Sequence, residues 1–262
     1  MNSFNSIDVL ISTYGDRIDN LKTVIQAPKP GVNYLIGHQS PVPYDLFSGR
    51  DDVHYFQLDS LGVAKSRNFL LNVSTSDICY FCDDDIILAD DFDQVLFDTH
   101  NNDSSEVITY CVRDEFGNPR KKILSPTKIR RNIFNILSVG TIEISLKRKS
   151  LGSIRFSENM GAGSLIPVGD ESVFLSEFIK SQKAVCFFNR TIAYHPQISS
   201  GYESNYMMVY ARGYTIRKVY GLFLGFLVLS IFSIKRPSLV FKPSVAKGVI
   251  NYIKGFFAYS SL

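Results

Sequence analysis

The sequence contains few cysteines, and their spacing argues against the disulfide framework of a small secreted protein. Only four occur among 262 residues. Cys79 and Cys82 form a C-x-x-C pair, but it lies in an apolar, strand-like run without the turn or helix start that lowers a thiol pKa. We therefore expect buried, reduced cysteines instead of a redox pair, in a reducing cytosol.

Two kinds of membrane signal are also missing. The first residues, MNSFNSIDVL, lack the charged start and long apolar stretch of a secretory signal. The uncharged run between Lys218 and Lys235 is sixteen residues long, whereas a spanning helix needs about 20 apolar residues. We therefore expect neither export nor a comfortable transmembrane segment.

Acidic residues are absent after Glu203, although the overall net charge of +3 conceals this. Residues 204–262 carry eight basic side chains and no acidic one, and residues 1–203 carry 20 basic and 25 acidic ones. The sequence therefore predicts an acidic body, residues 1–203, and a basic, apolar, helical C-terminal region, residues 204–262.

Basic residues on both sides of the apolar run favour association with an anionic membrane surface. Phe256, Phe257 and Tyr259 could anchor the last segment at such an interface. The alternative is a helical tail packed on the body, with its basic residues in water. Nucleic acid is a poor partner, because this region is far more apolar than a phosphate-binding arm. We expect a cytoplasmic protein, peripheral on the inner face of the cell membrane.

Apolar strands alternate with helical segments along the body. Residues 7–25 predict a strand, a polar turn and an amphipathic helix, and further strands are expected at residues 32–37, 53–58, 77–82, 107–112 and 141–146. A helix is expected at residues 61–73. This alternation predicts an α/β fold with a mainly parallel sheet covered on both faces. The basic connector at residues 120–131 predicts a surface loop, which could also contact an anionic substrate.

Three consecutive carboxylates, Asp83, Asp84 and Asp85, follow the strand at residues 77–82. Ligands of open α/β sheets bind beyond the carboxyl ends of the strands. Carboxylates at i and i+2 there offer oxygen ligands to Mg²⁺ or Mn²⁺, whose other positions water or a diphosphate can fill. The alternative is a turn or capping cluster at a strand end.

Two other segments add to this hypothesis. Arg67, in GVAKSRN, could meet a phosphate or neutralise the aspartates. Asp170 and Glu171 follow the glycine-rich stretch MGAGSLIPVG and begin a predicted helix. A carboxylate there could be a general base toward a hydroxyl, or only a helix cap favoured by the helix dipole.

Residues 7 to about 196 resemble the family 2 glycosyltransferases of the GT-A fold. DVLISTYGDR resembles the nucleotide-binding opening, GVAKSRNFLL the G-x-A-x-x-R-N helix, and ICYFCDDDIIL the strand with the D-x-D metal motif. FSENMGAGSLIPVGDESVFLSEFI resembles the F-x-E-x-x-G-x-G loop and the helix that starts at G-E-D. The four motifs occur in the family's order, which is more specific than any one of them.

The resemblance implies a GT-A, Rossmann-like nucleotide-diphospho-sugar transferase fold with a C-terminal helical tail. It implies that Glu171 or Asp170 is the catalytic base, because Gly169-Asp170-Glu171 replaces G-E-D. Asp85, with Asp83 and His195, would hold a divalent cation, Mn²⁺ or Mg²⁺. The implied nucleotide-sugar-binding residues are Thr13, Tyr14, Arg17, Arg67, Asp83 and Asp84. Gly37, His38 and Gln39 stand where the family usually has an acidic pair that reads the base.

The resemblance implies an inverting transfer from a nucleotide sugar, with a UDP-sugar expected, to a hydroxyl of a saccharide or lipid-linked saccharide. The pathway expected by analogy is capsule, O-antigen or other cell-surface polysaccharide biosynthesis. The first alternative is a sugar nucleotidyltransferase of similar fold, although STYGDRIDN does not resemble its glycine-rich loop. The second is a non-catalytic carbohydrate-binding or scaffolding protein that has kept the fold.

Overall fold

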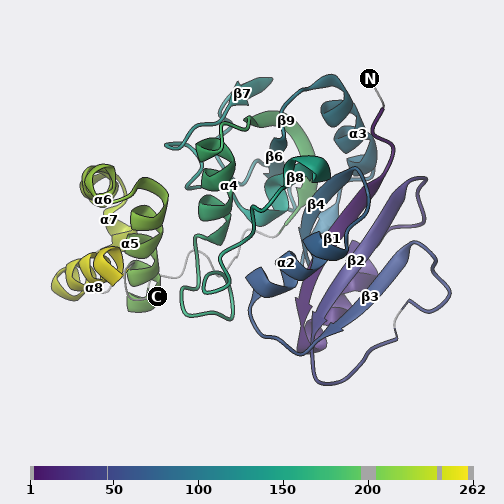
Figure 1. The fold of residues 1–262 in the computed structure, drawn as a ribbon, viewed down its shortest axis with the longest axis horizontal. Coiled ribbons are helices and arrows are strands. Elements are labelled where there is room, and N and C mark those ends of the chain that lie inside the picture. Colours follow the sequence, from purple (N-terminus) through teal and green to yellow (C-terminus); the bar gives the residue numbers. More distant parts are fainter. Residues whose placement is uncertain (1–2, 46, 196–204, 241–243, 259–262) are drawn as a thin grey trace.

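A nine-stranded sheet forms the centre of the protein (Figure 1). The structure is a computed structural model that describes residues 3–45, 47–195, 205–240 and 244–258. The strand order is β3-β2-β1-β4-β8-β6-β9-β5, and β7 pairs with β9. The strands are β1 (Ile7–Tyr14), β2 (Val32–Gln39), β3 (Val53–Leu58), β4 (Ile78–Asp83), β5 (Ile87–Leu88), β6 (Val107–Arg113), β7 (Lys128–Arg130), β8 (Ile144–Lys147) and β9 (Val185–Tyr194).

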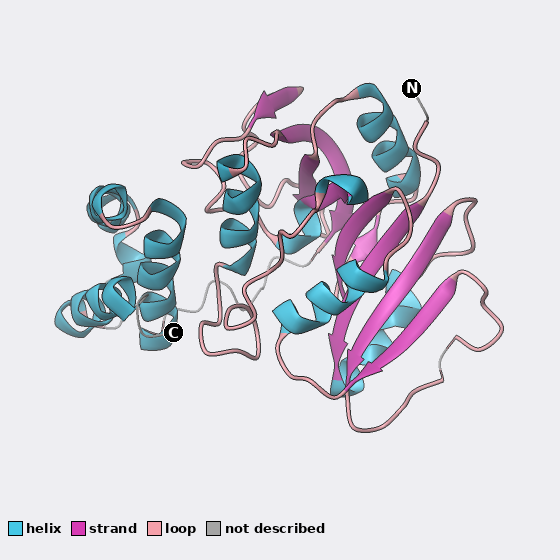
Figure 2. Ribbon diagram, in the orientation of Figure 1, coloured by secondary structure: helices cyan, strands magenta, loops and turns pink. Residues whose placement is uncertain are grey.

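Helices cover this sheet, and a separate group of helices forms one end of the molecule (Figure 2). The α-helices are α1 (Leu21–Val24), α2 (Val63–Val73), α3 (Phe92–Asn102), α4 (Asp170–Lys180), α5 (Tyr206–Tyr220), α6 (Phe223–Lys235), α7 (Pro237–Val240) and α8 (Val245–Phe257). Short 3₁₀ helices are η1 (Gly15–Asn20), η2 (Thr141–Glu143) and η3 (Arg148–Ser150).

The four strands from β3 to β4 are parallel, as the apolar strand pattern predicts. Both faces of these strands are buried because neighbouring side chains enter different cores. Leu10 belongs to the core beneath α2 and α4, whereas Val9 and Ile11 belong to the opposite core with α3.

All four cysteines are free and buried, and burial raises the pKa of the Cys79 thiol to about 12. The prediction of buried cysteines is confirmed.

The structure differs from the sequence prediction in three local segments. Residues 15–25 form a 3₁₀ helix followed by one short turn of α-helix, yet Ile18, Leu21 and Val24 are buried as their spacing predicts. The strand expected at residues 141–146 begins three residues late, because Thr141–Glu143 form η2. Within the basic connector, Lys128–Arg130 pair with β9, so the loop is shorter than expected.

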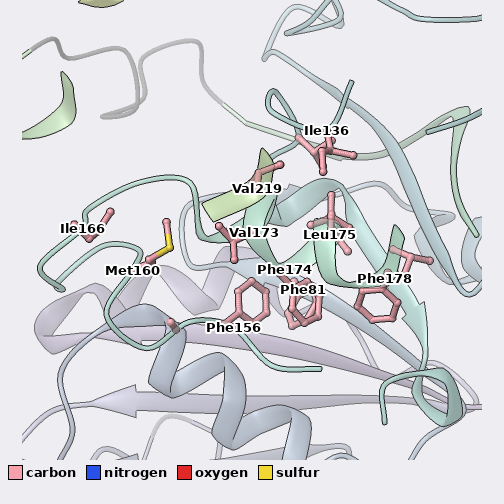
Figure 3. Packing of buried hydrophobic residues seen from close by; sticks show 14 of the residues in the cluster. Phe81, Ile136, Phe156, Met160, Ile166, Val173, Phe174, Leu175, Phe178 and Val219 are labelled. Atoms are coloured by element: carbon pink, nitrogen blue, oxygen red, sulfur yellow. The ribbon is translucent and has the colours of Figure 1, made fainter. Parts of the chain in front are cut away.

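The C-terminal helices pack on the body through α5. The side chain of Asn205 accepts a hydrogen bond from the backbone N–H of Met208 (2.9 Å) and so caps the start of α5. Figure 3 shows Val219 of α5 beside Val173 of α4, and both belong to the core that contains Phe174. The alternative of a tail packed on the body therefore holds for α5. The expected boundary after residue 203 falls within residues 196–204, outside the described residues.

None of the helices within the described residues has an apolar stretch long enough to cross a membrane. This agrees with the shortness of the uncharged run in the sequence. Most of that run forms α6.

Two glycines allow α5 and α8 to pack closely. A methyl group on Gly255 would overlap the carbonyl oxygen of Tyr210, and one on Gly213 would overlap that of Tyr252. Neither glycine has a positive φ angle, so close packing is the constraint at both positions. The short distance between the helix axes fixes α8 to α5.

We predict that Gly255→Ala lowers the free energy of unfolding by roughly 1–3 kcal/mol, because the backbones of α5 and α8 must separate. The control is Ser230→Ala on the exposed side of α6, expected to change it by less than about 0.5 kcal/mol. Chemical denaturation measures both. Equal stability of the two variants would contradict the close packing.

Candidate functional site

The residues singled out by their motifs meet at one edge of the sheet. Strands β1, β2 and β4 run parallel and end side by side, with Ser12 opposite Asp83 and Tyr14 opposite Gln39. Asp83 is the last residue of β4, and Asp84 and Asp85 follow it. Helices α2 and α4 bring their charged residues to the same edge. This is the edge at which α/β sheets bind ligands.

Asp84 is buried and faces the first strand. Its Oδ2 atom accepts a hydrogen bond from Thr13 Oγ1 (2.7 Å), and its Oδ1 atom accepts one from the Arg17 guanidinium. Burial raises the pKa of the Asp84 carboxyl, while Thr13 and Arg17 act in the opposite direction. Asp84 thus joins β1 and η1 to the end of β4.

Asp85 points outward and lies beside a histidine from β9's end. The Nε2 atom of His195 is 3.3 Å from Oδ1 of Asp85, and Arg17 donates to Oδ2 (2.9 Å). The hydrogen bond with His195 is the main cause that keeps the pKa of Asp85 below its ordinary value. The backbone N–H of His195 is held by the carbonyl of Arg113 (2.9 Å).

Asp85 and His195 together present an oxygen and a nitrogen ligand of the kind that Mn²⁺ accepts. Within the part of the chain that the structure describes, no group of three or more His, Cys, Asp or Glu side chains is arranged to hold a metal ion. A cation bound here would therefore take further ligands from water or a substrate.

Arg67 lies at the centre of the site and bridges two carboxylates. Its Nη1 atom donates to Asp170 (2.7 Å), and its Nη2 atom donates to Asp83 (3.2 Å). The guanidinium carbon is 5.5 Å from the centroid of the Phe156 ring. Burial alone would lower the pKa of Arg67, but Asp170 and Asp83 raise it above its ordinary value. Arg67 is therefore a buried, permanently charged link between α2, β4 and α4.

Asp170 and Glu171 are the first two residues of α4 but have different surroundings. Asp170 is 2% exposed and paired with Arg67, whereas Glu171 is partly exposed and accepts a hydrogen bond from Thr141 Oγ1 (2.7 Å). Burial, followed by the neighbouring Glu171 carboxylate, raises the pKa of Asp170, and Arg67 opposes this shift. Of the two carboxylates, Glu171 is the accessible one.

Two glycines make room for this helix start. Gly169 has a φ angle of +92°, and a side chain there would overlap Thr215 of α5. Gly161 has a φ angle of +89°, and a side chain there would press on Val63 and Asp170. The glycine-rich stretch therefore packs tightly against α2 and α5.

The side of the site formed by β2 carries no acidic pair. His38 is buried, with Nε2 3.0 Å from the carbonyl oxygen of Gly15 and Nδ1 2.9 Å from the hydroxyl of Tyr55. The amide of Gln39 donates to the carbonyl of Gly62 (3.2 Å). Tyr14 is exposed at the end of β1. Tyr14 is thus free of the core and accessible to a ligand.

Sequence reasoning missed three residues of this site. Thr141 contacts Glu171, and Phe156 lies beneath Arg67. Asn68 exchanges two hydrogen bonds with the backbone of Phe156 (2.8 and 3.0 Å) and so fixes that loop. Asn68 belongs to the GVAKSRN motif and could have been found from it, whereas no local pattern indicated Thr141.

We predict that Asp170 makes stability fall with rising pH. Its pKa is raised in the folded state, so its contribution is fully present below the ordinary value of 3.8 and is lost as the pH rises through the raised value. Between about pH 4 and pH 9, the melting temperature of Asp170→Asn should therefore change less than that of the wild type. Thermal unfolding measures this, with exposed Asp98→Asn on α3 as control. An unchanged pH profile in Asp170→Asn would refute the raised pKa.

Comparison with known proteins places these features in context. Residues 44–157, less than half of the chain, match the sequence profile of Glycosyl transferase family 2. This range contains GVAKSRN and the three aspartates. No curated protein matches the sequence significantly.

Solved structures of S. aureus TarS share the fold at low sequence identity. TarS 1-349 is 14% identical with a TM-score of 0.69, covering 97% of this chain and 80% of that one. A longer TarS structure is also 14% identical with a TM-score of 0.67, covering 96% of this chain, which spans only 48% of it. TarS 1-349 in complex with UDP-GlcNAc is 13% identical with a TM-score of 0.57, covering 98% and 92%.

The predicted fold class is confirmed. The chain has the mixed α/β GT-A fold with a central, mostly parallel sheet, and residues 44–157 carry the sequence pattern of Glycosyl transferase family 2.

Proposed function

We propose that this protein is a family 2 glycosyltransferase that transfers a sugar from a UDP-sugar to a hydroxyl group, with inversion. The observation that carries the proposal is the meeting of Asp83, Asp85, Arg67 and Glu171 at one edge of the sheet. The family match and the GT-A fold support it. TarS structures described as complexes with UDP and with UDP-GlcNAc support UDP as the nucleotide.

The chain's residues fit a divalent cation, Mn²⁺ or Mg²⁺. Asp85 and His195 are adjacent, and Asp83 ends β4 at the same edge with 36% of its side chain exposed. These are ligand types suited to such an ion, and its remaining positions would be filled by water and phosphate oxygens. When bound, the ion would neutralise charge on the leaving diphosphate.

The two arginines have different roles in this proposal. The Arg17 side chain is 54% exposed, whereas that of Arg67 is only 7% exposed and holds two carboxylates. Arg17 is therefore the guanidinium that can reach the diphosphate of the donor. Arg67 holds Asp83 and Asp170 in place and contributes a buried positive charge to the site. Fixed charge where the leaving group forms is expected to supply much of the rate.

Glu171 is the proposed general base. Its carboxylate is partly exposed and oriented by Thr141, whereas Asp170 is occupied by Arg67. The acceptor hydroxyl gives its proton to Glu171, and its oxygen forms a bond to the anomeric carbon. The bond from that carbon to the phosphate oxygen breaks on the opposite face, and the nucleoside diphosphate leaves with the electron pair.

The expected acceptor is a saccharide or lipid-linked saccharide in cell-surface polysaccharide biosynthesis. A lipid-linked acceptor would place the enzyme at the inner face of the cell membrane. The basic, apolar composition of residues 204–262 supports this location.

We predict that a UDP-sugar with Mn²⁺ raises the melting temperature, because a ligand that binds only the folded state stabilises it. GDP-, CMP- and dTDP-sugars serve as comparisons. The shift should vanish in Asp85→Asn and persist in the control Asp90→Asn, an exposed aspartate five residues further along. A thermal-shift panel measures all of these.

The panel and a separate assay for nucleotide-sugar synthesis distinguish the alternatives. No shift with any donor, in wild type as in Asp85→Asn, would favour the non-catalytic carbohydrate-binding or scaffolding protein. Formation of a nucleotide sugar from a nucleoside triphosphate and a sugar phosphate would instead favour the nucleotidyltransferase.

We predict that Glu171→Gln lowers kcat by about 10²–10⁴-fold, the usual contribution of a general base, while donor binding is retained. The control is Glu177→Gln on the same helix, whose side chain is 46% exposed. Release of UDP in the presence of acceptor measures the rate, and the thermal shift measures binding. A rate loss confined to Asp170→Asn would assign the base to Asp170.

A further inference from the structure

Helix α6 exposes many more large apolar side chains than it buries. Of its thirteen residues only Gly225 and Leu229 are buried. Phe223 is 90% exposed and Ile234 is 80% exposed, and four others are at least 40% exposed: Leu224, Phe226, Leu227 and Ile231. Soluble monomers rarely expose a contiguous apolar area of this kind.

Helix α8 contacts α6 and also exposes large apolar side chains. The ring of Phe226 lies 6.3 Å from that of Phe256, and the ring of Phe232 lies 6.3 Å from that of Tyr252, so the two helices pack together. The exposed apolar residues of α8 are Val245, Ile250, Ile253 and Phe257. We call the exposed apolar residues of α6 and α8 the α6–α8 surface.

The charged residues of α6 and α8 are all basic. Lys235 and Arg236 are exposed at the end of α6, and Lys247 and Lys254 are exposed on α8. The sequence has no acidic residue after Glu203. Exposed apolar side chains beside exposed basic ones are the pattern of an interfacial membrane helix.

We propose that the α6–α8 surface docks onto an anionic lipid bilayer, with α6 lying in the membrane interface. A 13-residue helix is about 20 Å long, which is shorter than the hydrocarbon core of about 30 Å. The apolar side chains would enter the boundary between headgroups and acyl chains, and the lysines and Arg236 would contact anionic headgroups. This inference rests on the proposed function only for the location of the acceptor.

A second copy of the chain is a poorer occupant of the same surface. A two-fold dimer would bring the four exposed basic residues of each copy close to those of the other, with no acidic side chain in this region to neutralise them. An anionic bilayer complements this charge instead of repelling it.

Docking would also fix the candidate site relative to the membrane. Helix α8 is tightly packed on α5, and α5 holds the loop before α4. Lys218 donates to Ser157 Oγ (2.7 Å), the Asn159 amide donates to the Tyr214 hydroxyl (3.2 Å), and Thr215 donates to the Val168 carbonyl (3.4 Å). A bilayer bound at α6 and α8 would therefore hold Glu171 at a fixed place above it.

Vesicle flotation tests this proposal on the full chain without donor or acceptor. Vesicles of phosphatidylcholine alone are compared with vesicles containing about 30% phosphatidylglycerol. We predict binding to the anionic vesicles and about tenfold weaker binding by Phe223→Ser/Ile234→Ser, because large apolar contacts are removed. The matched control is Phe116→Ser, whose side chain is 78% exposed in another part of the protein. It should bind as the wild type does.

A second variant, Lys235→Gln/Arg236→Gln, tests the charge without altering the apolar residues. It should also weaken binding to anionic vesicles, as should added salt. Failure of the wild type to bind, equal binding to neutral vesicles, or undiminished binding by both variants would overturn the proposal. The surface would instead be assigned to a second copy by three results together: the wild type does not bind vesicles, light scattering shows that it is a dimer, and Phe223→Ser/Ile234→Ser dissociates that dimer. Because donor binding is measured separately by thermal shift, failure of docking and failure of the proposed function are distinguishable.

Discussion

The site depends on one interaction, the pairing of the buried Arg67 guanidinium with two carboxylates. It reaches from α2 to Asp83 at the end of β4 and to Asp170 at the start of α4. A buried charge is tolerated only when it is paired, and breaking such a pair typically costs about 3–5 kcal/mol. The guanidinium of Arg67 thus sets the position of the end of β4, where the proposed metal ligands lie, relative to the start of α4, which carries the proposed base. The ring of Phe156 packs against the Arg67 guanidinium, and Asn68 holds the backbone of Phe156 by a hydrogen bond.

The C-terminal helices continue this scaffold. Thr215 of α5 lies against Gly169, the residue before Asp170, so α5 restricts the backbone at the start of α4. The aromatic side chains of Phe156, Phe174 and Phe178 pack together on the other side of that helix start (Figure 3). The helices that bear the α6–α8 surface are therefore connected through packed side chains to the start of α4, which carries the proposed base.

Much of the fold could be predicted because it depends on local patterns. The apolar run at Val53–Leu58 forms β3 at its expected bounds, and the helix from residue 61 begins only two residues late. The prediction of an α-helix within residues 15–25 was wrong in its helix type. Apolar spacing indicates which side chains are buried, but it does not distinguish a 3₁₀ turn from an α-helix. Strand β7 was not predicted, because it forms by pairing with β9, whose residues are far away in the sequence.

The sequence predicted which residues form the site, but not which of them are hydrogen-bonded to one another. The motifs identified Arg67 and the aspartates, yet only the structure pairs Asp84 with Thr13 and Arg67 with Asp170. The choice between Asp170 and Glu171 was open because neighbouring helical residues point about 100° apart, and tertiary packing decides which one is buried.

The most direct measurement is a crystal structure of the protein with UDP and Mn²⁺, in which anomalous scattering locates the metal. We expect the nucleotide at the edge where β1 and β4 end, beside Tyr14, and the metal on Asp85 and His195 with a diphosphate oxygen. A nucleotide bound elsewhere, or a metal away from Asp85, would contradict the proposed donor site.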